Sequence, residues 1–139
     1  MLSRILVPMD DSEMAERALA YAIENNPEAA VTVLHVVGEP SPMWGAASGL
    51  ALEGDLETAA AELAEPVFDR ARAIADDHDV TVETEVRLGH PARAILDRAE
   101  GFDTVVIGSH GGTVADRLVV GDVAQTVFRR SPVPVTVVR

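Results

Sequence analysis

The chain has 139 residues, of which 47% are hydrophobic, so it is long enough and apolar enough to form one packed domain over residues 1–139. This composition excludes an intrinsically disordered chain. Cysteine is absent, which excludes disulfides, thiolate metal ligands and cysteine nucleophiles.

The charge of the chain is strongly negative. Its 23 acidic residues outnumber 11 arginines, there is no lysine, and the net charge is −12. Nucleic acid and anionic membranes are poor partners for such a surface, because both attract cationic side chains. A soluble acidic surface is the simplest interpretation. The missing lysine favours a second one, a halophilic protein in a cytoplasm where salt screens the self-repulsion.

The N-terminal segment does not resemble a targeting signal. Its apolar run, residues 5–8, is short, and Asp10 and Asp11 follow at once. No segment reaches the roughly 18 apolar residues that a membrane-spanning helix needs. We therefore expect a cytoplasmic protein.

Five segments are predicted to be strands, and helical patterns separate them. The strands are residues 5–8, 31–37, 80–88, 104–107 and 133–138. The helices are residues 13–25, 52–77, one opened by Pro91, and one within 116–130. Pro66 is predicted to kink or break the second helix near Glu65. The stretch 38–50, rich in Gly, Pro and Ser, is predicted to be either a mobile lid or a disordered loop.

This alternation predicts an α/β fold, a single doubly wound parallel sheet with helices on both faces. The first and fourth strands are continuous apolar runs, so they should be central, whereas residues 80–88 alternate like an edge strand. Ligands of such sheets bind at the carboxyl ends of central strands. The candidate segments are therefore residues 8–10 and 108–112.

The second candidate segment is rich in glycine. Gly108 and Gly111 would let the backbone approach a phosphate closely, and consecutive amides would form an anion nest. Gly121 is interpreted as the point where the loop ends and a helix begins, with free amides facing an anion. Turn geometry and tight helix packing would explain the same glycines, so their spacing alone leaves a structural role open.

Longer stretches resemble the universal stress protein family. Residues 108–139 resemble its C-terminal signature, residues 5–13 its first strand and helix start, and residues 33–36 its second strand. The resemblance spans essentially the whole chain. It implies a five-stranded parallel sheet in the order 3-2-1-4-5 and a homodimer, which we expect to form through the C-terminal strand. It also implies, in one branch of the family, ATP binding through a G-x2-G-x9-G-[Ser/Thr] motif.

The same resemblance implies which residues would hold the nucleotide. Asp10 would contact the adenosine part, while His110 and Val123 would flank the phosphates. The base and ribose would be lined by Pro8, Met9, Val36 and Ile107. The glycine spacing of the motif is matched by Gly108, Gly111 and Gly121.

Three positions depart from the ATP-binding pattern. Met9 stands where threonine is usual, Ala124 replaces a residue able to carry a hydroxyl, and Asp122 occupies the Ser/Thr position. An ionised carboxylate cannot donate a hydrogen bond to a phosphate oxygen. A magnesium ion would suit both groups and bridge them. The expected cofactor is ATP or AMP, with or without magnesium.

Three functions compete. The first is a stress-response or regulatory protein that binds an adenine nucleotide without rapid turnover. The second, kept open by Asp122, is a member of the branch that does not bind ATP and acts through its dimer surface. The third, an ATP-using enzyme of related fold, is least favoured, because residues 8–12 do not match the loop of such enzymes and a Walker loop needs lysine. No catalytic residue and no protein metal site are predicted, and His35 is interpreted as a packed strand histidine.

Overall fold

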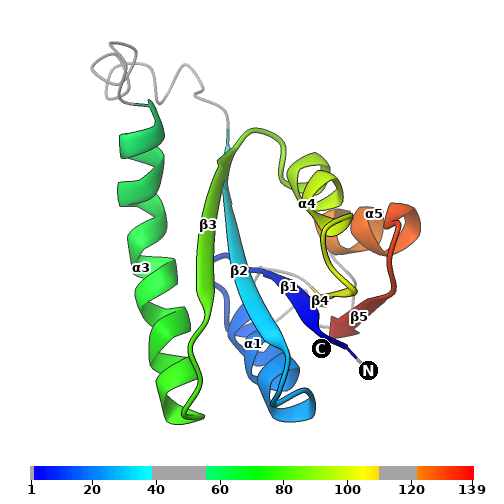
Figure 1. Ribbon diagram of the computed structural model, residues 1–139. Coiled ribbons are helices and arrows are strands. Elements are labelled where there is room, and N and C mark those ends of the chain that lie inside the picture. The colour runs from blue at the N-terminus through cyan, green and yellow to red at the C-terminus, as the bar shows by residue number, and fades with distance from the viewer. Residues whose placement is uncertain (1, 39–55, 110–121) are drawn as a thin grey trace.

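One parallel sheet organises the chain (Figure 1). The computed structural model describes residues 2–38, 56–109 and 122–139. Its sheet has the order β3-β2-β1-β4-β5, and every neighbouring pair is parallel. The strands are β1 (Arg4–Pro8), β2 (Ala30–Val37), β3 (Glu83–Leu88), β4 (Thr104–Gly108) and β5 (Val135–Val138). The predicted α/β fold and its strand order are confirmed.

Helices in the described part of the chain cover both faces of the sheet. They are α1 (Glu13–Asn25), α3 (Leu56–Asp77), α4 (Pro91–Ala99) and α5 (Asp122–Arg130). Successive side chains of β1 point to opposite faces of the sheet, so the core has one part on each face, each covered by helices. Ile5 and Val7 pack with α1 and α3, whereas Leu6 packs on the other face with α4 and α5. All three side chains are fully buried, so β1 is held from both sides.

The predicted placing of the strands is also confirmed. β1 and β4 are interior strands with buried apolar runs, and the alternating strand β3 forms an edge. The helix starts agree with the sequence as well. The Ser12 hydroxyl accepts a hydrogen bond from the Ala15 amide at 3.2 Å and caps α1. Pro91 is the first residue of α4, where its missing N–H is no loss.

Of the kink or break predicted near Pro66, the break is wrong. Residues Leu56–Asp77 form one helix that continues through this proline. A proline inside a helix costs about 3 kcal/mol, because it removes a hydrogen bond and crowds the preceding turn. Ala64, Val67 and Phe68, on either side of it, are buried against the core. Their burial outweighs the local penalty, as tertiary packing commonly does in amphipathic helices.

The predicted start of the third strand, at Val80, is also wrong, since β3 begins at Glu83. Asp79 follows α3 with a φ of 56°, the left-handed conformation that ends many helices. The Val80 amide then bonds back to the Ala75 carbonyl at 3.0 Å. Val80 therefore belongs to the helix cap, and it packs against the core from there.

Parts of three predictions lie outside the described residues. These are the stretch 39–50 of the predicted lid or loop, residues 52–55 of the second helix, and residues 116–121 of the last helix.

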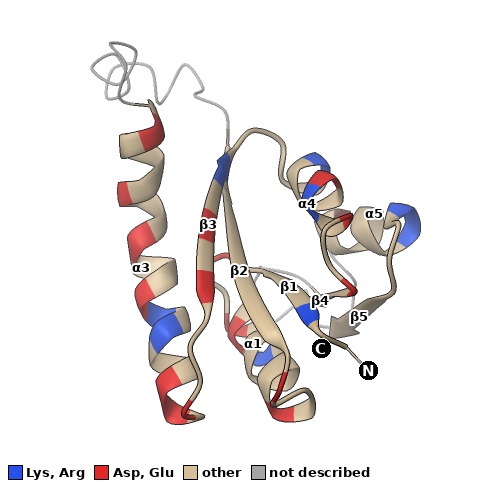
Figure 2. Cartoon of the chain, viewed as in Figure 1, with Lys and Arg blue, Asp and Glu red and all other residues tan. Residues whose placement is uncertain are grey.

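Charge is distributed unevenly over the described elements. Acidic side chains run along α3, whereas arginines are prominent on α4 and at the end of α5 (Figure 2). Within the described ranges, none of the helices combines the length and the apolar character needed to cross a membrane.

Candidate functional site

The site is built where β1 ends before its neighbour does. The last paired residues of β1 and β2 are Pro8 and Leu34, and β2 runs on to Val37. The Met9 amide still bonds to the Leu34 carbonyl at 2.8 Å, after which the chain turns into α1. His35 and Val36 therefore lie beside a notch at the carboxyl end of the sheet, where parallel α/β folds bind ligands.

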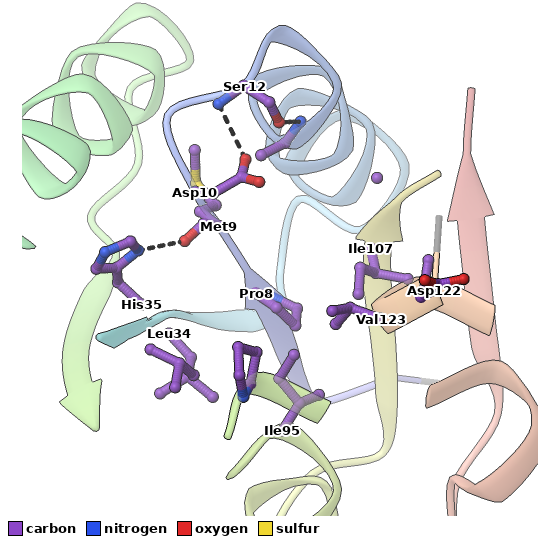
Figure 3. Close-up of a pocket in the computed structure, with 15 residues that line it drawn as sticks. Pro8, Met9, Asp10, Ser12, Leu34, His35, Ile95, Ile107, Asp122 and Val123 are labelled. Carbon is purple, nitrogen blue, oxygen red and sulfur yellow. Dashed lines mark hydrogen bonds between the residues drawn. The ribbon is translucent and has the colours of Figure 1, made fainter. Parts of the chain in front are cut away.

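A cavity of about 290 Å³ opens at this notch (Figure 3). Its walls come from the ends of β1, β2 and β4 and from the starts of α1, α4 and α5. Eight of the predicted site residues line it: Pro8, Met9, Asp10, Val36, Ile107, Gly108, Asp122 and Val123. The other three, His110, Gly111 and Gly121, lie outside the described residues.

Asp10 is held by the turn that leads into α1. Its Oδ1 atom accepts a hydrogen bond from the Ser12 amide at 2.9 Å, and Ser12 in turn caps the helix. Asp10 is thus fixed by an Asx-type turn and does not itself serve as the N-cap. One of its two carboxylate oxygens supports the loop.

His35, interpreted from the sequence as a packed strand histidine, lies in β2 and lines the cavity. It is half-buried, and its Nδ1 atom lies 2.7 Å from the Met9 carbonyl oxygen. A carbonyl only accepts, so Nδ1 must carry the proton, and this tautomer is assigned from the contact. In the neutral ring, Nε2 then has a lone pair that accepts hydrogen bonds.

Gly108 has a packing reason to lack a side chain. A Cβ at this position would lie 2.8 Å from both the carbonyl carbon and the oxygen of Met14, in the first turn of α1. Backbone atoms inside a close-packed helix have little room to move away. Gly108 therefore lets α1 approach β4, and a role in phosphate binding stays a prediction.

Asp122 lies at the opposite side of the cavity from His35 (Figure 3). It is the first described residue of α5 and is exposed. The following residues, Val123 and Ala124, complete this wall.

The polar character of the cavity comes from few groups. Among its described lining residues, the side chains able to carry charge are Asp10, His35 and Asp122, and none is an arginine. Within the same described ranges, no cluster of three or more His, Asp or Glu side chains is arranged to hold a metal ion. Apart from Ser12 and Gly108, apolar side chains form the rest, as in most small-molecule sites.

The family model that describes the universal stress protein family matches residues 1–139. The chain belongs to the universal stress protein family. The predicted family resemblance is thereby confirmed.

Three relatives show how close this universal stress protein is to known members. Universal stress protein MJ0531 of Methanocaldococcus jannaschii is 32% identical over 98% of this chain and 81% of its own length. The solved structure of MJ0577 from the same organism has a TM-score of 0.77 and 30% identity, over 98% of this chain and 94% of that one. A crystal structure of a universal stress protein in complex with cAMP has a TM-score of 0.66 and 26% identity, over 99% and 97% of the two chains.

Relatives differ in length. The chain spans 47% of a longer universal stress protein from Mycolicibacterium smegmatis, with which it is 30% identical.

Several residues at the site of this universal stress protein were not predicted. They are Ser12, Ala15, Leu34, His35, Pro91 and Ile95. Pro91 and Ile95 come from α4, whose apolar face could be recognised from the sequence but not assigned to this cavity. His35 could not be assigned to the cavity from the sequence, because its position depends on how far β2 extends beyond the end of β1. That extension is set by the strand register.

Proposed function

We propose that this universal stress protein binds an adenine nucleotide, ATP or AMP, in the cavity at the carboxyl ends of β1 and β4. It would act as a stress-response module that responds to the nucleotide without turning it over rapidly. The observation that carries the proposal is the convergence of four separate segments. Their predicted residues, eight in all, line one cavity at the point where the strand order switches.

The chemistry of the walls suits an adenosine group. Pro8, Ile95 and Ile107 offer apolar surface for a flat base. Asp10 and the Nε2 atom of His35 supply acceptors of the kind that bind hydroxyl groups or an amine. The related structure in complex with cAMP supports the adenine part of the proposal.

Phosphate binding would depend on Asp122. In the ATP-binding pattern its position holds a hydroxyl, and a carboxylate there lacks the donor. We expect ATP to bind better with magnesium than without it, because the ion would neutralise charge between carboxylate and phosphate.

Calorimetry with AMP and with ATP, each with and without magnesium, tests the proposal. Asp10→Asn keeps an oxygen for the Ser12 amide but removes the charge, so it should weaken binding about tenfold, or about 1.4 kcal/mol. The matched control is Asp11→Asn, which changes the net charge equally at a residue that does not line the cavity. Absence of binding to the wild type, together with a nucleotide-free native mass spectrum of fresh protein, would refute the proposal.

One observation favours the alternative, a universal stress protein of the non-ATP-binding branch that acts through its dimer surface. β5 is an edge strand whose valines are only half-buried. The carbonyls of Pro134 and Val138 accept bonds from the amides of Val105 in β4 and of Ser109 just after it. The alternating pattern therefore turns the backbone groups of Val135 and Val137 toward the open edge. Such an edge invites pairing with a second copy.

Light scattering at molar salt tests this dimer. Val137→Pro removes an outward amide, which an edge strand tolerates, and should give a folded monomer. A monomeric wild type would refute the dimer.

The acidic composition supports a halophilic protein. At about 0.01 M salt the screening length is roughly 30 Å, so acidic groups across the whole molecule repel one another. The melting temperature should therefore rise steeply toward molar salt. A flat profile would contradict this proposal.

A further inference from the structure

One large aromatic side chain is exposed near the end of α5. Two of the three phenylalanines, Phe68 and Phe102, are 5% exposed and pack in the core. The third, Phe128, is 60% exposed, the highest value among the large apolar side chains of the described residues. Single exposed apolar residues are common on protein surfaces. The residues around Phe128 therefore decide whether it marks a contact surface.

The residues that follow Phe128 are basic. Arg129 and Arg130 lie in the last turn of α5, and both are exposed. Two arginines suit the carboxyl end of a helix, because that end carries a partial negative charge. This role explains the arginines but not the exposed phenylalanine between them and the core.

The charge of this surface is opposite to that of the other face of the sheet. There α3 carries six acidic side chains and two arginines. Arginines of that face are paired within the chain, Arg17 with Glu13 at 3.4 Å and Arg70 with Glu16 at 2.5 Å. Figure 2 shows the acidic side chains along α3 and the basic side chains at the end of α5. The end of α5 is thus a basic surface on a molecule whose net charge is −12.

An exposed aromatic ring beside arginines has the composition of a protein–protein contact centre. Aromatic and arginine side chains are enriched there and dominate the binding energy. A guanidinium group binds a carboxylate through two parallel hydrogen bonds. Covering the ring of Phe128 removes apolar surface from water, which favours binding. These groups together suit a partner that presents an apolar side chain between carboxylates.

The net charge of the chain limits the kind of partner. Duplex nucleic acid is densely anionic and would be repelled by the acidic remainder of the molecule. A short acidic segment carries few charges, and acidic groups more than about 8 Å away are largely screened from it at physiological salt. The local arginines and the ring can therefore outweigh the distant repulsion for a peptide.

We propose that Phe128, Arg129 and Arg130 form a docking surface for an acidic peptide segment of another protein, in which an apolar side chain stands between carboxylates. Phe128 is the apolar anchor, and the two arginines bind the carboxylates. None of the three is among the described walls of the cavity. The docking surface therefore does not depend on the proposed nucleotide site.

Nuclear magnetic resonance with isotope-labelled protein tests this surface. The probe is a synthetic capped peptide, Glu-Asp-Leu-Glu-Asp-Leu-Glu-Asp, added at the lowest salt concentration where circular dichroism shows native protein. The backbone signals of residues 127–131 should shift most and should saturate. A peptide with serine in place of leucine, and one with Gln and Asn in place of the acids, should each bind at least about tenfold more weakly.

Variants of the protein separate the apolar contribution from the charged one. Phe128→Ala should weaken peptide binding at least about tenfold both at low salt and at molar salt, because salt does not screen an apolar contact. Replacing Arg129 and Arg130 together by glutamine should weaken it about fivefold at low salt and hardly at molar salt.

The matched controls lie on the opposite face of the sheet. Leu63→Ala removes an apolar side chain that is 48% exposed on α3, and Arg17→Gln removes an exposed positive charge on α1. Both should keep the affinity of the wild type. Absence of shifts at residues 127–131, or equal effects of Leu63→Ala and Phe128→Ala, would overturn the proposal.

Two other occupants of this surface are also tested. If the peptide fails to bind and the protein instead self-associates in a way that Phe128→Ala abolishes, a second copy occupies the surface, and the proposed acidic partner is wrong. If a short DNA duplex shifts residues 127–131 and the peptide does not, the surface binds nucleic acid, and the proposal is wrong as well. Failure of nucleotides to bind overturns the proposed function and leaves the docking surface intact.

Discussion

The two ends of the sheet use charged side chains in opposite ways. At the amino end, the Asp103 carboxylate accepts hydrogen bonds from the amides of Ser3 and Arg4, both at 2.9 Å. These two amides lower the pKa of Asp103 below its usual value, which keeps the carboxylate charged. The Arg4 guanidinium donates to the Gly101 carbonyl at 2.6 Å. Each of these groups has a partner within the chain.

An aromatic ring completes the amino end. Phe102 is 5% exposed, and the guanidinium carbons of Arg4 and Arg98 lie 4.7 Å and 5.1 Å from its ring centre. Arg98 also donates to Glu85 at 2.6 Å. Burial opposes ionisation of Glu85, but Arg98 and Arg87 outweigh it and lower the pKa of this carboxyl.

Among the described residues, the carboxyl end holds a smaller set of partners, the Ser12 amide that donates to Asp10 at 2.9 Å. Its carboxylates, Asp10 and Asp122, face a cavity whose described walls include no arginine. The difference agrees with a stabilising role for the amino end and with the ligand site proposed at the carboxyl end. Substitutions at the amino end should therefore change stability first, whereas substitutions at the carboxyl end should change binding unless they disturb the packing of α1.

Phe102→Ala should produce the largest loss of stability. It removes a buried aromatic side chain together with its contacts to two arginines, and such truncations cost about 3–5 kcal/mol. Urea unfolding at constant salt would measure the change in the free energy of unfolding. The matched control is Phe128→Ala, whose ring is 60% exposed and should cost little. Similar losses in the two variants would contradict the assignment of the amino end as the stable one.

Gly108→Ala should produce the next largest loss, and it tests the boundary between the two ends. The added Cβ would lie 2.8 Å from the Met14 backbone, so α1 must shift. Overpacking of this kind costs about 1–3 kcal/mol. Gly38→Ala makes the same chemical change with no atom within 4 Å of the new Cβ, so its melting temperature should hardly move. If the two variants melt alike, the contact with α1 is not what requires glycine.

Much of the fold could be predicted from local patterns. Continuous apolar runs marked the interior strands, because a strand buried on both faces is apolar throughout. Alternation marked the edge strand, because a strand buried on one face alternates apolar and polar residues. The errors came where a local pattern had two meanings. Val80 and Val82 alternate like a strand, yet Val80 closes the cap of α3. Pro66 should interrupt a helix, but buried neighbours hold the helix together.

The sequence could predict those residues of the candidate site that a single segment identifies by its place after a strand. Asp10 and Gly108 follow interior strands, so the general rule for parallel sheets points to them. His35 and Ile95 could not be found in this way, because they reach the cavity through strand register and helix packing. Gly108 shows the same limit, since its spacing suggested phosphate binding and the structure adds a contact with Met14.

His78 offers the smallest and most specific test at the amino end. It ties the end of α3 to α1, with Nδ1 2.9 Å from the Ile74 carbonyl oxygen and Nε2 3.1 Å from a Glu24 carboxylate oxygen. Both partners are acceptors, so only the protonated ring can donate to both at once. The Ile74 carbonyl and the Glu24 carboxylate accordingly raise the pKa of His78 above its usual 6.5.

A raised pKa in the folded state means that protonation favours folding. The stabilisation by His78 is therefore fully present below about pH 6.5 and is lost as the pH rises through the raised value. Thermal melts at pH 6 and pH 8.5 in constant salt should show that His78→Gln lowers the melting temperature more at pH 6. The difference should be a few degrees or less, because the side chain is 26% exposed and the ion pair is screened. Glu24→Gln should share this pH dependence, whereas Glu28→Gln, an exposed neighbour, should not. An equal effect of His78→Gln at both pH values would show that the ring acts only by packing.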